Sequence, residues 1–176
     1  MFEKIKFNLA HYLIRKKYLV IKSVPVTFNG ILSNSSTFFI IMPGDPVEFS
    51  KSTMLIIFLL EKHKVVTVLL DESKLDLISG KEDVTFIKYM DETKSRLNLP
   101  VKPFVRMLQS KEFDVVMDLN RSSDVFSTAV ANIVKSKVKV GFEQQKTDDY
   151  YDIRIVNSNQ DPDLIYTNYI NFLKMF

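Results

Sequence analysis

Residues 37–46 read TFFIIMPGDP, and this stretch decides the expected fold. Residues 37–42 form a short, unbroken run of β-branched, aromatic and other apolar side chains, which is typical of a strand buried on both faces of a sheet. The two prolines and Gly44 that come next cannot continue a strand, so a loop must follow. The stretch therefore predicts an inner strand that ends in a turn at one edge of a parallel sheet.

Downstream of this strand, apolar runs of strand length alternate with helix-like segments. The further strands are expected at residues 65–70, 84–87, 113–119 and 138–142. Helices are expected from a cap at Ser50 to about His63, over 103–110, from a cap at Ser122 or Ser123, and from Asp161-Pro162. Such alternation forms right-handed βαβ units. The expected class is α/β, a Rossmann-like mostly parallel sheet with helices on both faces.

The segment before residue 37 has a different character, because its apolar residues recur at helical spacing. An amphipathic helix is expected over residues 2–18, with Phe2, Ile5, Leu9, Tyr12 and Leu13 on its apolar face and Lys4, Asn8, His11 and Arg15 on the other. Pro25, Gly30 and the polar run at 33–36 then predict a loop. We therefore expect an N-terminal helix with a linker over 1–36 and the main α/β domain over 37–176.

Two interpretations of the N-terminal helix stay open. A basic amphipathic helix with aromatic residues on its apolar face can lie in a membrane interface beside anionic lipid. The same face can instead pack on its own domain or on a second subunit. The surface expected to meet a membrane, a protein partner or another copy of the chain is formed by Phe2, Ile5, Leu9, Lys16 and Lys17.

Composition narrows the class of protein. The chain has 176 residues, no cysteine and a formal net charge of +3, so it fits one domain without disulfides, and its charge does not indicate a nucleic-acid partner. No apolar run approaches the roughly 20 residues of a membrane span, and no signal peptide is readable, which favours a cytoplasmic location. Four glycines without fingerprint spacing and two isolated histidines predict neither a cofactor nor a metal.

Polar residues follow the first and fourth expected strands. In a doubly wound sheet these strands are neighbours, and ligands bind beyond their carboxyl ends. Asp45, Asp118, Asn120 and Arg121 are therefore expected to converge, where a carboxylate accepts a proton from a hydroxyl and the arginine holds an anion. A purely structural interpretation competes, because an aspartate before proline is a common turn residue and Asp118 can satisfy backbone donors.

Three segments resemble the N-terminal half of the heptosyltransferase-like glycosyltransferases of family 9. Residues 112–120, EFDVVMDLN, are similar to the family's "YDLVIDLQG", with Asn120 in place of glutamine and Arg121 in place of the next glycine. Residues 138–142, VKVGF, resemble its "RRIGF", and residues 39–45, FIIMPGD, resemble its first strand and "GD" turn. The order and spacing of the three segments extend the resemblance over residues 37–176.

The resemblance implies roles as well as ancestry. It places Asp45, after Gly44, at the position of the proposed base that activates the acceptor hydroxyl, with Asp118, Asn120 and Arg121 beside it. It also implies that the nucleotide sugar binds to a second domain, which residues 37–176 do not include. We therefore expect no transferase activity from these residues alone, and a binding or assembly module as the leading function. A split enzyme with a separate donor-binding chain and a structural subunit of a membrane-associated complex are the alternatives.

Overall fold

The computed structural model describes residues 2–19, 30–78, 82–144, 149–156 and 159–175. The strands are β1 Thr37–Ile41, β2 Val65–Asp71, β3 Val84–Tyr89, β4 Glu112–Asp118, β5 Lys135–Phe142 and β6 Ile153–Ile155. The α-helices are α1 Phe2–Lys17, α2 Ile31–Asn34, α3 Pro46–Glu61, α4 Lys102–Gln109, α5 Val125–Ile133 and α6 Pro162–Lys174. Two short 3₁₀ helices are η1 Glu72–Leu77 and η2 Asp91–Thr93.

The strands form one six-stranded sheet in the order β3-β2-β1-β4-β5-β6, and every neighbouring pair is parallel. β1 lies inside the sheet, where Phe38 pairs with Val66 on one side and with Val115 on the other. The strand order reverses between β1 and β4, as in a doubly wound fold. The expected α/β class with a parallel, Rossmann-like sheet is confirmed.

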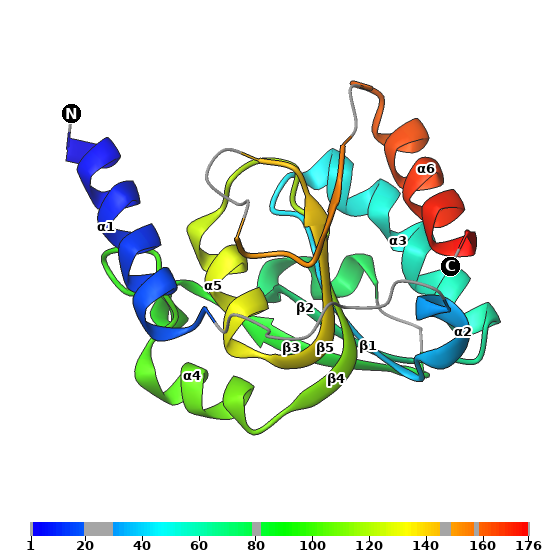
Figure 1. The fold of residues 1–176 in the computed structure, drawn as a ribbon, viewed down its shortest axis with the longest axis horizontal. Helices are drawn as coiled ribbons and strands as arrows, with labels where there is room; N and C mark the ends of the chain where they lie inside the picture. The colour runs from blue at the N-terminus through cyan, green and yellow to red at the C-terminus, as the bar shows by residue number, and fades with distance from the viewer. Residues whose placement is uncertain (1, 20–29, 79–81, 145–148, 157–158, 176) are drawn as a thin grey trace.

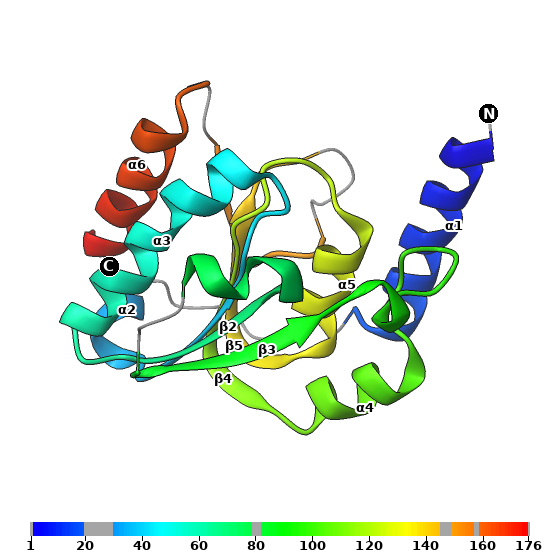
Figure 2. The ribbon, with the colours of Figure 1, turned by 180° about the vertical axis from the view of Figure 1, so that it is seen from behind.

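Alternate residues of β1 face two separate layers of helices. Phe38 and Ile40 pack in a core with α2, α3 and α6, and Phe39 and Ile41 pack in another with α1, α4 and α5. Figures 1 and 2 show the two groups of helices on opposite sides of the sheet. Burial on both faces explains why the β1 sequence is apolar throughout rather than alternating.

Two helices are capped by aspartates rather than by the expected serines. α3 begins at Pro46, because Asp45 Oδ1 accepts hydrogen bonds from the backbone nitrogens of Val47 and Glu48, both at 2.9 Å. The prediction of a cap at Ser50 is therefore wrong by five residues. α5 is capped by Asp124, whose Oδ2 accepts from Ser127 N at 2.7 Å, and the prediction of a cap at Ser122 or Ser123 is wrong. An aspartate satisfies the free N–H groups of a helix start as well as a serine does.

The N-terminal helix is present, but it buries a different face from the expected one. Ala10, His11 and Ile14 are buried against the layer that contains α5, whereas Phe2, Ile5, Leu9 and Tyr12 are exposed. His11 is accommodated because its Nδ1 lies 3.1 Å from the Tyr150 hydroxyl, which in turn donates to the His11 carbonyl oxygen at 3.1 Å. The buried imidazole thus has a polar partner, as burial of a polar group requires.

The expected linker is described only in part. Residues 31–34 form the single turn α2 rather than a loop, because Asn34 N donates to Gly30 O at 2.7 Å and Ile31 packs into the core. Pro25 lies outside the described residues. The division of the chain at residues 36 and 37 therefore stays a prediction. Among the described residues, no helix has both the length and the apolar character that a bilayer span requires.

The start of β1 is tied to β4 by one carboxylate. Asp114 Oδ2 accepts from Ser36 N at 2.8 Å, Thr37 N at 3.0 Å and Thr37 Oγ1 at 3.1 Å, while Oδ1 lies 2.7 Å from Lys137 Nζ. The bond from Lys137 and those from the two backbone nitrogens lower the pKa of Asp114. Asp114 therefore ties the beginning of β1 to β4, at the end of the sheet opposite the carboxyl ends of the strands.

Replacing Asp114 by alanine should lower the free energy of unfolding by about 1 to 2 kcal/mol, because it removes the acceptor of two backbone N–H groups, of which that of Thr37 is partly buried. Urea denaturation measures this difference. The matched control is Glu112→Ala, on the same strand and exposed, for which a change within about 0.5 kcal/mol is expected. Equal losses for the two variants would contradict the structural role of Asp114.

Candidate functional site

A polar cleft of about 420 Å³ opens beyond the carboxyl ends of β1, β2 and β4. It spans the place where the strand order reverses, which is where open α/β sheets bind ligands. The lining comprises carboxylates, lysines, hydroxyls, an amide and two aromatic rings. These residues are Gly44, Asp45, Glu48, Asp71, Ser73, Lys74, Tyr89, Lys94, Asn120, Ser122, Ser123, Asp124 and Phe126.

Asp45 stands exposed at the mouth of this cleft. The chain places it there because β1 ends at Ile41 and α3 begins immediately after Asp45. Its Oδ1 is engaged in capping α3, and among the described residues no hydrogen bond reaches Oδ2. The second oxygen is therefore open to a hydroxyl or an N–H group of a ligand.

Lys74 fixes the turn that carries Gly44. Its ammonium donates to the carbonyl oxygens of Pro43, at 3.3 Å, and of Gly44, and it lies 5.0 Å from the centre of the Phe49 ring. Burial lowers the pKa of this ammonium, and the charges of Asp71 and Asp45 oppose the effect. Lys74 thus holds the turn through its backbone while adding a positive charge to the cleft.

Asn120 joins the loops after β1 and β4. Its Oδ1 accepts from Gly44 N at 3.2 Å, and its Nδ2 donates to Asp118 Oδ1 at 2.8 Å and to Ser127 Oγ at 3.1 Å. Its backbone carbonyl accepts a further bond from Gln144. These contacts tie the loop after β1 to the loop after β4 at the edge of the cleft.

Asp118 lies below the cleft rather than in it, with 1% of its surface exposed. Its Oδ1 accepts from Asn120 N at 3.0 Å, and its Oδ2 accepts from the Tyr151 hydroxyl at 2.6 Å. Burial raises the pKa of this carboxyl to about 6, although the bonds from Tyr151 and Asn120 oppose the rise. In this arrangement Asp118 positions Asn120, and contact with a ligand would require the loop above it to move.

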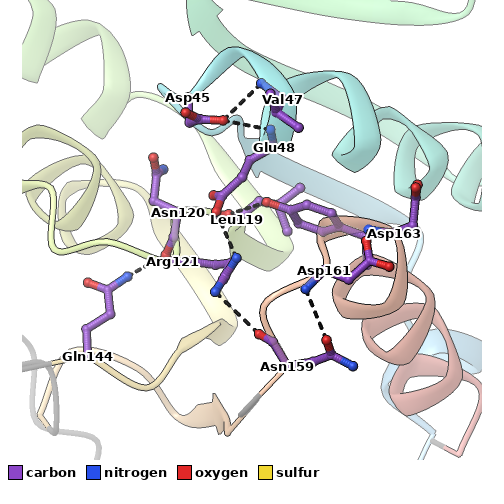
Figure 3. A network of polar contacts seen from close by, with 11 residues as sticks. Asp45, Val47, Glu48, Leu119, Asn120, Arg121, Gln144, Asn159, Asp161 and Asp163 are labelled. Carbon is purple, nitrogen blue, oxygen red and sulfur yellow. Dashed lines mark hydrogen bonds and ion pairs between the residues drawn. The ribbon is translucent and has the colours of Figure 1, made fainter.

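Arg121 is not among the residues that line the cleft, and it joins α3 to the segment before α6 (Figure 3). Its Nη1 lies 3.0 Å from Glu48 Oε1, and its Nη2 donates to the Asn159 carbonyl oxygen at 3.4 Å. Burial raises the pKa of Glu48, while the charge of Arg121 lowers it. The guanidinium is therefore already paired with a carboxylate of this chain.

The helix starts that border the cleft are occupied by carboxylates of the chain itself. Asp45 caps α3, Asp124 caps α5, and Asp71 caps η1 through Ser73 N at 3.0 Å. Rossmann folds that bind dinucleotides instead place a pyrophosphate at such a helix start. A phosphate here would meet three carboxylates, so the cleft is suited to an uncharged ligand with hydroxyl groups. The described residues contain no cluster of metal-ligating side chains.

The structure brings Gly44, Asp45 and Asn120 together in the cleft, as expected from strands that are neighbours. Several lining residues escaped the sequence analysis. The most important are Glu48, Asp71, Lys74 and Asp124. Asp71 ends β2 and Lys74 follows it, and the rule that ligands bind beyond carboxyl strand ends would have found them if applied to that strand. The residues predicted on the N-terminal helix lie outside this cleft: Phe2, Ile5, Leu9, Lys16 and Lys17.

No protein-family model matches the chain, and no curated protein matches its sequence. Among solved structures it is similar to E. coli heptosyltransferase WaaC with ADP, at 14% identity and a TM-score of 0.51, over 75% of this chain and 46% of that one. It is also similar to UDP-GlcNAc 2-epimerase from Neisseria meningitidis bound to UDP-GlcNAc, at 13% identity and a TM-score of 0.39, over 99% and 43% of the two chains. The chain thus spans less than half the length of either protein. The first likeness shows a shared, glycosyltransferase-like α/β fold.

Proposed function

We propose that the chain is a non-catalytic binding module, related to the acceptor-binding half of heptosyltransferase-like glycosyltransferases, whose cleft holds an uncharged, hydroxyl-rich ligand such as a sugar. The observation that carries the proposal is the polar cleft at the β1–β4 junction, with Asp45 exposed at its mouth. A ligand of this kind matches the resemblance of residues 37–176 to the half of the family that faces the acceptor.

The chemistry of the lining supports this ligand class. Sugar hydroxyls both donate and accept hydrogen bonds, so they need carboxylate acceptors beside neutral and cationic donors. Asp45 and Asp71 supply acceptors, Lys74 and Lys94 supply donors, and the serine hydroxyls of the lining supply both. Hydrogen bonds to charged groups contribute more than neutral ones, which allows a small open cleft to select such a ligand.

The absence of catalysis is part of the proposal. Glycosyl transfer requires donor and acceptor to be held together in one geometry. In the family that residues 37–176 resemble, the donor is held by a second domain that these residues do not include, so they hold only the acceptor side. A second candidate is a split transferase, favoured by the open Oδ2 of Asp45, which would act as the base once another chain brought the donor.

The test uses nuclear magnetic resonance of the ¹⁵N-labelled chain, titrated with glucose, galactose and maltose, and separately with ADP. We expect at least one sugar to shift the amide signals of Gly44, Ser73 and Asn120, while ADP leaves them unchanged. Asp45→Asn should weaken sugar binding about tenfold or more, because the amide retains the helix cap but loses the carboxylate acceptor.

Asp161→Asn is the matched control, because Asp161 also caps a helix that starts with proline and lies outside the cleft. It should leave sugar binding unchanged. Shifts of the cleft amides by ADP, or equal sugar binding by Asp45→Asn and the unaltered protein, would overturn the proposal. Sugar transfer by the purified chain from a nucleotide sugar would contradict its non-catalytic part, and transfer restored by a second chain would favour the split enzyme.

A further inference from the structure

Helix α1 carries two apolar faces, and only one of them packs on the domain. Phe7 contributes to the layer that buries Ala10, His11 and Ile14. The second face follows the spacing of three, four and three residues that defines one side of a helix. Its side chains are exposed by 69, 58, 45 and 58% at Phe2, Ile5, Leu9 and Tyr12.

This exposed stripe lies on the side of α1 away from the domain. At 100° per residue, the exposed and the buried sets fall on opposite sides of the helix. Figure 1 shows α1 at the edge of the molecule, with its N-terminal end projecting beyond α5. A flat partner can therefore approach the stripe without meeting the rest of the domain.

The stripe is surrounded by positive charge. Helix α1 contains five basic residues and one acidic residue, Glu3. The basic residues are Lys4, Lys6, Arg15, Lys16 and Lys17. Glu3 pairs with Lys6, and Asp149 pairs with Arg15 at 3.2 Å. Among the described residues, no carboxylate pairs with Lys4, Lys16 or Lys17. Lys16 lies in line with the stripe, with its ammonium 5.9 Å from the centre of the Tyr12 ring.

We propose that this stripe binds the interface of an anionic lipid bilayer, with α1 lying along the membrane surface. The four apolar side chains enter the boundary between headgroups and acyl chains, and the lysines contact the anionic headgroups. A second copy of the chain fits less well, because two stripes facing each other would bring two strongly basic helices together. An anionic bilayer has the complementary charge. The domain, attached through the opposite face of α1, then stays in water with its cleft accessible.

The test is flotation of the full chain with vesicles of phosphatidylcholine containing 30% phosphatidylglycerol, and with vesicles of phosphatidylcholine alone. We expect binding to the anionic vesicles and at least tenfold weaker binding to the neutral ones. Ile5→Ser with Leu9→Ser should weaken binding about 100-fold. Lys16→Glu with Lys17→Glu should weaken it about 25-fold or more, at about fivefold per lysine.

Matched controls change the same chemistry elsewhere on the surface. Leu164→Ser removes an exposed leucine of α6, and Lys62→Glu with Lys102→Glu reverses two exposed lysines outside α1. These variants should bind as the unaltered chain does, and thermal unfolding should match for all of them. Absence of vesicle binding, or binding that survives Ile5→Ser with Leu9→Ser, would overturn the proposal. So would a dimer in native mass spectrometry that this pair of substitutions converts to a monomer.

Discussion

Replacing Asp118 by asparagine is expected to remove a large part of the pH dependence of stability between pH 4 and 7. The carboxyl is buried, and burial raises its pKa to about 6 in the folded protein, against an ordinary value of 3.8. Asparagine has nearly the same shape and can still accept from Asn120 N, while its amide can donate to the Tyr151 oxygen. The substitution therefore removes the titration and keeps most of the contacts.

The raised pKa of Asp118 determines whether the unfolding free energy rises or falls with pH. Below about pH 4 the carboxyl is protonated in both states. Between pH 4 and 6 the unfolded chain loses the proton while the folded protein keeps it, so rising pH stabilises the unfolded state. Above pH 6 the loss is complete and constant. A pKa near 6 against 3.8 corresponds to about 3 kcal/mol. The unfolding free energy of the unaltered protein should fall by about 2 kcal/mol of this relative to Asp118→Asn between pH 4 and 7, because the unfolded carboxyl is already partly ionised at pH 4.

Urea denaturation of both proteins at half-unit intervals of pH measures the difference. Tyr151→Phe provides a second test, because the Tyr151 hydroxyl lowers the pKa of Asp118 in the folded protein and its removal should extend the pH-dependent loss to higher pH. The ¹³C carboxyl signal of Asp118 reports the titration directly. Parallel stability curves for the unaltered protein and Asp118→Asn, or a carboxyl signal that titrates below pH 4, would contradict the burial argument.

The inner strands β1, β2 and β4 could be predicted from the sequence because they are largely buried on both faces. Residues 37–42 are apolar without alternation for this reason, and strands near the other expected positions follow from the same pattern. Helix starts are harder to predict, because Asp45 also suits a turn before proline and the serines at 50, 122 and 123 also suit caps, whereas the caps are Asp45 and Asp124. Aspartate and serine perform the same capping chemistry, so residue type alone does not choose between them.

For the N-terminal helix, the spacing of apolar residues predicts the wrong buried face. The sequence of α1 contains two apolar stripes, and the more hydrophobic of them, through Phe2, Ile5 and Leu9, is the exposed one. The buried face instead includes His11, a polar residue that becomes acceptable in the core only because Tyr150 lies beside it. That partner is 139 positions away along the chain, so no local pattern could reveal it.

The candidate site, like the fold, could be predicted only in part. The neighbouring positions of β1 and β4 bring Gly44, Asp45 and Asn120 to one cleft, which the topology rule anticipated. The burial of Asp118 depends on Tyr151, which arrives from the segment after β5, and the direction of Arg121 depends on Glu48 inside α3. Both outcomes depend on tertiary packing and not on spacing within either loop.

Substitution of Gly141 should have the second large effect on stability. The ring of Tyr151 occupies the space that a side chain at residue 141 would need. A Cβ atom at residue 141 would lie 2.8 to 2.9 Å from three atoms of that ring. The ring cannot easily retreat, since it is buried and its hydroxyl is bonded to Asp118 at 2.6 Å. The glycine is therefore needed for close packing between β5 and the segment before β6, and not for its backbone freedom.

Gly141→Ala should consequently lower the free energy of unfolding by about 3 kcal/mol, from overpacking together with a weakened bond to Asp118. Gly44→Ala is the matched control, because a Cβ there meets nothing within 4 Å, and a change within about 0.5 kcal/mol is expected. In a double-mutant cycle, adding Tyr151→Ala should make the alanine at 141 nearly neutral, since the obstructing ring is gone. If the two losses added without coupling, contact with Tyr151 would not be the reason for the glycine.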